Sequence, residues 1–339
     1  MGHGRKREDV AVPRFFISFC TDGSQAHDVC AQKWRNAAMK KSRGETSQLL
    51  RREARAAWVM MAPALIVLGV VAVYPVLRTF WISLHEMNLK RPQSGFPFIG
   101  LANYAKILTD VRAQQDILFT FKFTIVTVLL ETLFGFATAL VINQSFRGRG
   151  IARAAILIPW AIPTSVSAMM WKFIYNDQYG LFNDILLKIG VIDGYKAWLT
   201  SDPFLCLVIT DVWKTFPYMA LLILAGLQML PLELYESAML DGAGVVKRFR
   251  YITLPLVKRT VLVAMLFRTL DAFRVFDLIS VMTSGSVGTE SIAIYAQKQM
   301  MSFLNFGYGS ALAVLIFAVV LSISLVYMKF IGSDMLPVD

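Results

Sequence analysis

The chain has 339 residues, of which 56% are hydrophobic and only 17% are charged. Soluble domains usually carry about a quarter charged residues, so this composition and a mean hydropathy of +0.55 exclude an ordinary soluble domain and indicate a membrane protein. The net charge of +11 does not indicate nucleic-acid binding, because the basic residues precede or flank apolar segments. We therefore expect a lipid bilayer, and no nucleic acid, among the partners of the chain.

The first part of the chain, residues 1–55, is predicted to be a basic cytoplasmic tail without stable structure. Its apolar run Val10–Cys20 is short and interrupted by Pro13 and Arg14, which argues against both a signal peptide and a lipoprotein cleavage site. An alternative is that translation starts at Met39, and we expect the residues before it to be dispensable.

Residues 56–339 are predicted to form a domain of six transmembrane helices. At about 1.5 Å per residue, each apolar run can cross a hydrocarbon core of about 30 Å. The predicted spans are Ala56–Leu77, Phe121–Ile142, Ala154–Ile174, Phe204–Met229, Thr260–Met282 and Phe306–Ile331. Pro159 and Pro163 are expected to kink the start of the third span. Charges in the fourth and fifth spans are typical of helices that line a cavity.

An even number of spans places both termini on one side of the membrane. The connections Arg147–Arg153 and Pro231–Arg259 share that side with the basic tail and are rich in Arg and Lys. The loop Thr79–Asp116 on the other side also carries basic residues, which weakens the contrast. The positive-inside rule then predicts a multi-pass membrane protein with both termini in the cytoplasm.

The cytoplasmic loop at about residues 230–257 has the pattern of a helix, a turn and a second helix. Pro231 suits a helix start, Gly242 permits a turn, and Pro255 marks the beginning of the next span. Leu240 is an apolar residue on a helix face that also carries Glu233 and Glu236. Such a face is typical of a docking surface, but a helix lying at the membrane surface has the same periodicity, so both alternatives stay open.

This loop resembles the EAA loop of the membrane subunits of binding-protein-dependent ABC importers, with Ser237 where Ala is usual. In that family the loop forms a coupling helix that sits in a groove of a separate ATPase subunit. The resemblance implies ATPase coupling by Glu236, Ser237, Ala238, Leu240, Asp241, Gly242, Ala243, Ile252, Leu254 and Pro255.

Other stretches resemble the sugar-type branch of these importers, related to the larger membrane subunit of the maltose importer. They are Pro63–Pro75, Phe98–Tyr104, Asp211–Tyr218 and Ala225–Gln228. The resemblance extends from about Trp58 to the end and implies an all-α, multi-pass protein of the bacterial inner membrane with the type I ABC importer permease fold. It also implies a second, non-identical permease, two copies of an ATP-binding subunit and an extracytoplasmic solute-binding protein, for which a lipoprotein is one form.

The sequence predicts no catalytic role for this chain. It contains no G-x(4)-G-K-[ST] motif, so ATP and Mg are expected on the partner ATPase subunits and no cofactor on this chain. The three cysteines share no metal-ligand spacing with one another, and the three histidines are scattered, so we expect neither a bound metal nor a disulfide framework.

Charged residues within the fourth and fifth predicted spans mark a candidate substrate pathway. Asp211 and Lys214 are three residues apart and can pair on one helix face. Arg268, Asp271, Arg274 and Asp277 repeat at the same spacing around a helix. A charge that faces lipid costs at least a few kcal/mol, so these residues should face protein or a wet cavity. One hypothesis is structural, with buried pairs that fix the helix register and Glu131 as a further partner.

The other hypothesis is sugar binding, because the stretches Asp211–Tyr218 and Arg268–Val275 resemble those that line the sugar site in the maltose importer. Tyr218 would stack on a sugar ring, and charged side chains would hydrogen-bond its hydroxyls. The predicted pathway comprises Asp211, Lys214, Thr215, Tyr218, Arg268, Asp271, Ala272 and Val275.

Three substrate or transport classes remain after this comparison. The stretch Leu266–Arg274 resembles trehalose-type importers, which favours a disaccharide such as trehalose or maltose. Glycerol phosphate is the alternative, because Arg268 and Arg274 could meet a phosphate. A secondary transporter is more distant, because such folds usually show internal repeats with matched broken helices.

Overall fold

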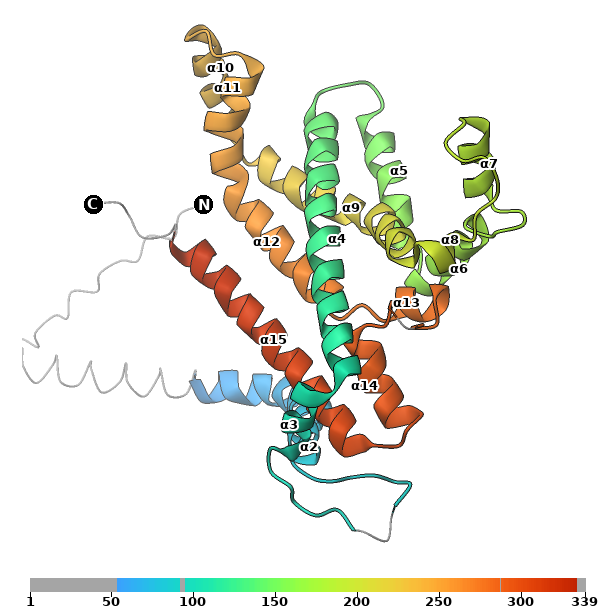
Figure 1. Cartoon of the computed structure of the whole chain (residues 1–339). Coiled ribbons are helices and arrows are strands. Elements are labelled where there is room, and N and C mark those ends of the chain that lie inside the picture. The colour runs from blue at the N-terminus through green and yellow to red at the C-terminus, as the bar shows by residue number, and fades with distance from the viewer. Residues whose placement is uncertain (1–53, 92–94, 287, 334–339) are drawn as a thin grey trace, which may run out of the picture. The chain divides into compact units, whose positions relative to one another are not determined.

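The computed structural model describes residues 54–91, 95–286 and 288–333 (Figure 1). Within these ranges the chain is helical, and its β-type pairing is limited to two isolated bridges, His85 with Phe98 and Asn88 with Asn305. The described residues divide into two compact units after Pro75, with residues 54–75 in the first and the described part of 76–333 in the second. The helix α2 (Tyr74–Ser83), preceded by the π-helical turn η2 (Gly69–Val73), continues across their boundary.

The second unit contains the helices that follow α2 in the described residues. They are α3 (Ala102–Thr109), α4 (Val111–Asn143), α5 (Arg149–Ala161), α6 (Thr164–Ile174), α7 (Leu181–Lys188), α8 (Trp198–Ser201), α9 (Pro203–Gln228), α10 (Leu232–Leu240), α11 (Val245–Arg248), the π-helical turn η4 (Phe249–Thr253), α12 (Leu254–Ala272), α13 (Asp277–Met282), α14 (Ile292–Met301) and α15 (Phe306–Ser333).

The core of this unit is the packing of α4 against α9, with α12 lying against both (Figure 1). Small residues allow the close approach of these helices, as is common in membrane proteins. A Cβ atom at Gly135 would lie 2.7 Å from the Cβ of Met219, and one at Gly226 would lie 2.7 Å from the hydroxyl of Thr260. Both glycines therefore fix the spacing at which the three helices meet.

An aspartate at the start of α4 anchors this helix to α14 and α15. Asp110 accepts hydrogen bonds from the backbone amides of Arg112 and Ala113, as an N-cap residue does. It also accepts from the hydroxyls of Tyr295, at 2.7 Å, and Tyr308, at 2.6 Å. Partial burial acts to raise the pKa of the Asp110 carboxyl, but these hydrogen bonds outweigh it and hold the pKa below its ordinary value of 3.8.

Among the described residues, four helical segments are long and apolar enough to cross a membrane, namely Ala54–Ser83, Val111–Asn143, Pro203–Gln228 and Phe306–Ile331. Helices α5 and α6 make a fifth span if the two are counted together. The predicted membrane character is thus confirmed, while the count of six is not. The tail predicted for residues 1–55, including the alternative start at Met39, lies outside the described residues except for Ala54 and Arg55, which are helical.

The predicted third span is broken rather than kinked. Helix α5 ends at Ala161, α6 begins at Thr164, and their axes differ by 89°. Pro163 precedes α6 and has no amide hydrogen, so the hydrogen-bond ladder of α5 cannot continue through it. The bend therefore follows from the second of the two prolines.

The predicted fifth span is not one continuous apolar helix. Helix α12 ends at Ala272, and α13 begins only at Asp277. The backbone carbonyl of Val275, within the break, accepts a hydrogen bond from the hydroxyl of Ser291 at 2.8 Å. Arg274 and Asp277 consequently do not continue the helical repeat of Arg268 and Asp271, which corrects the prediction that all four wind around one helix.

Candidate functional site

A buried ion cluster joins α4, α9 and α12 at the centre of the second unit. Arg268 is 3% exposed, and its guanidinium binds Glu131, which is fully buried, and Asp211, which is 6% exposed. Its Nη2 lies 2.9 Å from Oε1 of Glu131. The hydroxyl of Thr215 donates to the same carboxylate. One arginine of α12 is thus held by carboxylates from both neighbouring helices.

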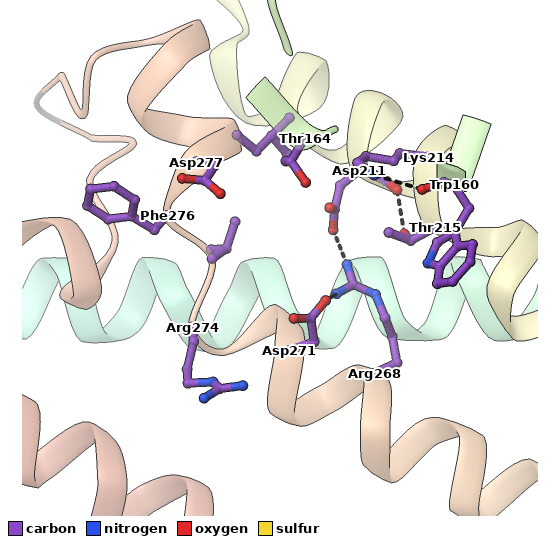
Figure 2. Close-up of a pocket in the computed structure, with 12 residues that line it drawn as sticks. Trp160, Thr164, Asp211, Lys214, Thr215, Arg268, Asp271, Arg274, Phe276 and Asp277 are labelled. Atoms are coloured by element: carbon purple, nitrogen blue, oxygen red, sulfur yellow. Dashed lines mark hydrogen bonds and ion pairs between the residues drawn. The ribbon is translucent and has the colours of Figure 1, made fainter. Parts of the chain in front are cut away.

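Next to this cluster lies a cavity of about 250 Å³ (Figure 2). The break after α12 supplies part of its wall, since Arg274, Val275 and Phe276 all line it. Asp271 also lines the cavity, and its carboxylate accepts from Nη1 of Arg268 at 3.0 Å. Its side chain is 72% exposed, whereas the other two carboxylates bound to Arg268 are buried. Asp271 is therefore the member of the network that a solute can reach.

An aromatic pair lines an adjoining cavity of about 460 Å³, which also includes Arg268 and Asp271. The rings of Trp160 and Tyr218 are stacked, with centroids 5.4 Å apart and planes inclined by 13°. Trp160 lies in the last turn of α5, just before the bend. Tyr218 was predicted from the sequence to lie in the pathway, whereas Trp160 was not, although the position of Trp160 between two prolines of a predicted span is a usable signal.

Lys214 lines the first cavity, but its ammonium group contacts backbone rather than a carboxylate (Figure 2). Its Nζ donates to the carbonyl oxygens of Ile162, at 2.9 Å, and Trp160, at 3.3 Å. Asp211, the partner expected from the sequence, is paired with Arg268 instead. The predicted pair of Asp211 and Lys214 is therefore not formed: Asp211 binds Arg268, and Lys214 binds two backbone carbonyls.

The structure gathers most of the predicted pathway residues around these two cavities. Asp211, Lys214, Thr215, Arg268, Asp271 and Val275 line the first, and Tyr218 lines the second. Ala272 is 1% exposed and lines neither of the two. Glu131, expected from the sequence only as a structural partner, lines neither cavity but contacts Arg268, which lines both.

The predicted coupling loop is formed by α10, a turn, α11 and η4. Helix α10 begins after Pro231 and ends at Leu240, as the pattern indicated. Gly242 follows with a φ of +74°, and the amide of Ala243 donates to the carbonyl of Ala238 at 2.8 Å. Such a hydrogen bond closes the C-terminus of a helix whose following residue has a left-handed backbone conformation, and glycine is favoured at that residue. The hydroxyls of Tyr235 and Thr253, 2.9 Å apart, tie α10 to η4.

The residues assigned to coupling occupy consecutive parts of this loop. Glu236, Ser237, Ala238 and Leu240 lie on α10, Asp241, Gly242 and Ala243 in the turn, Ile252 in η4, and Leu254 and Pro255 at the start of α12. No residue of α10 is buried, and the Leu240 side chain is 90% exposed. The helix therefore presents an apolar side chain that this chain does not cover within its described part.

Residues 131–334 match the family model described as "Binding-protein-dependent transport system inner membrane component". A trehalose/maltose transport system permease protein of Thermococcus litoralis is 45% identical over 286 residues, covering 84% of this chain and 96% of the relative. A sulfoquinovosyl glycerol transport system permease protein of Agrobacterium fabrum is 39% identical, covering 80% and 89%.

The fold has a counterpart among solved structures. A crystal structure of a bacterial ABC transporter involved in alginate import superposes with a TM-score of 0.72 and 19% identity, covering 85% of this chain and 99% of that chain. This likeness supports the permease fold, and the family match extends over the ion cluster, both cavities and the loop. The chain belongs to the inner-membrane components of binding-protein-dependent transport systems, which are the permeases, and not the catalytic subunits, of ABC importers.

Proposed function

We propose that the chain is a permease subunit that moves a neutral disaccharide, such as trehalose or maltose, across the inner membrane. The observation that carries this proposal is the stacked pair of Trp160 and Tyr218 beside the exposed carboxylate of Asp271. Aromatic faces suit the apolar face of a sugar ring, and a carboxylate accepts strong hydrogen bonds from its hydroxyls. The name of the Thermococcus relative supports the same substrate class.

Glycerol phosphate fits this site less well, because the two most buried cationic side chains of the site already bind other groups of the protein. The Arg268 guanidinium binds three carboxylates, and the Lys214 ammonium binds two backbone carbonyls. A phosphate at Arg268 would have to displace a carboxylate and then lie next to the others, which costs Coulomb energy in a poorly solvated site. Arg274 alone gives the phosphate alternative its remaining support, since it lines both cavities.

The energy for transport would arrive through the loop at α10. An exposed Leu240 on a short helix with an ordered turn suits a groove on another protein. We propose two copies of an ATP-binding subunit, which carry ATP and Mg, a second and non-identical permease, and an extracytoplasmic solute-binding protein as partners. Both termini and the α10 loop would lie on the cytoplasmic side.

Uptake of labelled solutes by cells that express the complete transporter tests the substrate. We expect trehalose or maltose to be transported and glycerol phosphate not to compete. Asp271→Ala and Tyr218→Ala should each raise the KM for the sugar by about threefold to tenfold, the equivalent of about 0.7–1.4 kcal/mol. Asp193→Ala is the matched control, because Asp193 is exposed and lines neither cavity.

Two results would contradict this proposal. Unchanged sugar kinetics in both variants, with normal assembly, would reduce these residues to a structural role. Transport of glycerol phosphate, with no competition by either sugar, would replace the disaccharide with the alternative substrate.

A further inference from the structure

We propose that Lys214 is a positioning residue of the substrate pocket, which holds Trp160 in place by binding the backbone at the end of α5. This inference rests on the proposed sugar site and assigns to Lys214 a role other than direct contact with the sugar. It would make the break between α5 and α6 a part of the binding site.

The end of α5 is a position where a cation is favourable. The last carbonyls of a helix have no partner within the helix and carry partial negative charge. Pro163 has no amide hydrogen to offer them, and the chain turns by 89° into α6. The Lys214 ammonium reaches the carbonyls of Trp160 and Ile162 from α9, so it supplies the donors that the broken helix lacks.

Trp160 of α5 is held through its side chain as well as through its backbone. Tyr218 lies one helical turn beyond Lys214 on α9, so both project from one face of that helix. Lys214 binds the backbone of Trp160, and Tyr218 stacks on its indole ring. These two contacts fix both the location and the tilt of the ring that lines the larger cavity.

The surroundings of Lys214 favour this role over an ion pair or a direct ligand. Its side chain is buried, with the residue 6% exposed. The neighbouring Asp211 carboxylate is taken by Arg268, as Figure 2 shows, and the ammonium points to the end of α5. A lysine used in this way affects the sugar only through Trp160.

A double-mutant cycle tests this dependence, because two residues that act through one contact give non-additive effects. The variants are Lys214→Met, Trp160→Ala and the double variant, with the KM and Vmax of sugar uptake measured in the complete transporter. Lys214→Met should raise the KM by about threefold to tenfold, the range expected for losing an ordered aromatic contact, with a smaller effect on Vmax. In the Trp160→Ala background the same change should leave the KM unaltered.

Two further variants separate positioning from general stability. Lys214→Arg keeps the positive charge, so its KM should lie close to the wild-type value. Lys172→Met is the matched control, because Lys172 also donates to a backbone carbonyl of another helix, that of Val281 at 3.4 Å, but is exposed and lines neither cavity. We expect this control to leave KM and Vmax unchanged, and copurification of the partner subunits to be normal in every variant.

The outcomes distinguish this inference from the proposed function. If Trp160→Ala raises the KM and Lys214→Met does not, or if the two effects add fully, the positioning role is wrong and the sugar site stands. If neither Trp160→Ala nor Tyr218→Ala changes the KM, the sugar site itself is wrong and the inference fails with it.

Discussion

At the residue scale, the central feature is a guanidinium that three carboxylates share. Arg268 of α12 binds Glu131 of α4 and Asp211 of α9. Arg268 and these two carboxylates are each at most 6% exposed. Charges at this depth are costly unless each is paired. The structural and functional hypotheses for these charges are therefore compatible, since the buried pairs fix three helices and leave the exposed Asp271 for solute.

Removal of this guanidinium should destabilise the protein severely. Arg268→Met leaves Glu131 and Asp211 buried and facing one another without a cation, and breaking a buried pair in this way costs about 3–5 kcal/mol. We expect a large fall in the melting temperature of the purified protein in detergent. The double change Glu131→Gln with Arg268→Met should recover part of the loss, because it removes one of the two buried charges.

The matched control for this prediction is Arg274→Met. Arg274 lines the same cavity six residues later but is exposed, so its loss should alter the free energy of unfolding by about 0.5 kcal/mol or less. Equal melting temperatures for Arg268→Met and Arg274→Met would show that the buried cluster contributes nothing to stability.

At the element scale, the sequence predicted regular features better than breaks. Helix α10, its start at Pro231 and its glycine turn follow from local residue preferences, and the structure has them at the predicted residues. The break after α12 does not follow from such preferences, and the carbonyl of Val275 within it is satisfied by the hydroxyl of Ser291, 16 residues further along the chain. Hydrogen bonds of this range leave no periodic signal in a sequence.

For the candidate pocket, the sequence predicted the charged residues but not the aromatic residue Trp160. Charges within apolar runs identified the residues of α9 and α12, since lipid would reject them. Trp160 carries no charge and is as compatible with lipid as with a cavity, so composition could not select it. The two flanking prolines mark a disturbed helix there, but the 89° bend that brings the last turn of α5 to Lys214 and Tyr218 is seen only in the structure.

The turn after α10 provides a test of the coupling element. Gly242→Val forces a β-branched residue to a φ of +74°, which costs about 1–2 kcal/mol or more and should displace α10 from its position. We expect membrane insertion to be normal and ATP-driven uptake to fall by about tenfold or more.

Gly244→Val is the matched control for this change. Gly244 is two residues away in equally open space, but its φ is −67°, which valine adopts without strain. Wild-type uptake in the Gly242 variant, or equal losses in both variants, would show that the left-handed turn has no part in coupling.

At the scale of the whole molecule, the described chain leaves a helix with apolar side chains uncovered. Helix α10 has no buried residue, and Leu240 at its end is 90% exposed. The family to which the chain belongs depends on a separate binding protein by its description, and a permease without an ATP-binding motif needs an external source of energy. The proposed complex, in which an ATP-binding subunit covers α10, would account for this exposure.

Copurification of a tagged chain with its partners tests this assembly. Leu240→Asp places a charge where an apolar groove is expected, and it should weaken ATP-binding subunit capture by about fivefold to thirtyfold, the equivalent of about 1–2 kcal/mol. Capture of the second permease should be unchanged, because the proposal assigns only the ATP-binding subunit to α10. Leu101→Asp, at a leucine that is 69% exposed and predicted to lie on the opposite side of the membrane, should leave both interactions intact. Full retention of the ATP-binding subunit by Leu240→Asp would place its docking surface outside α10, because a buried aspartate at the centre of such a contact could not be tolerated.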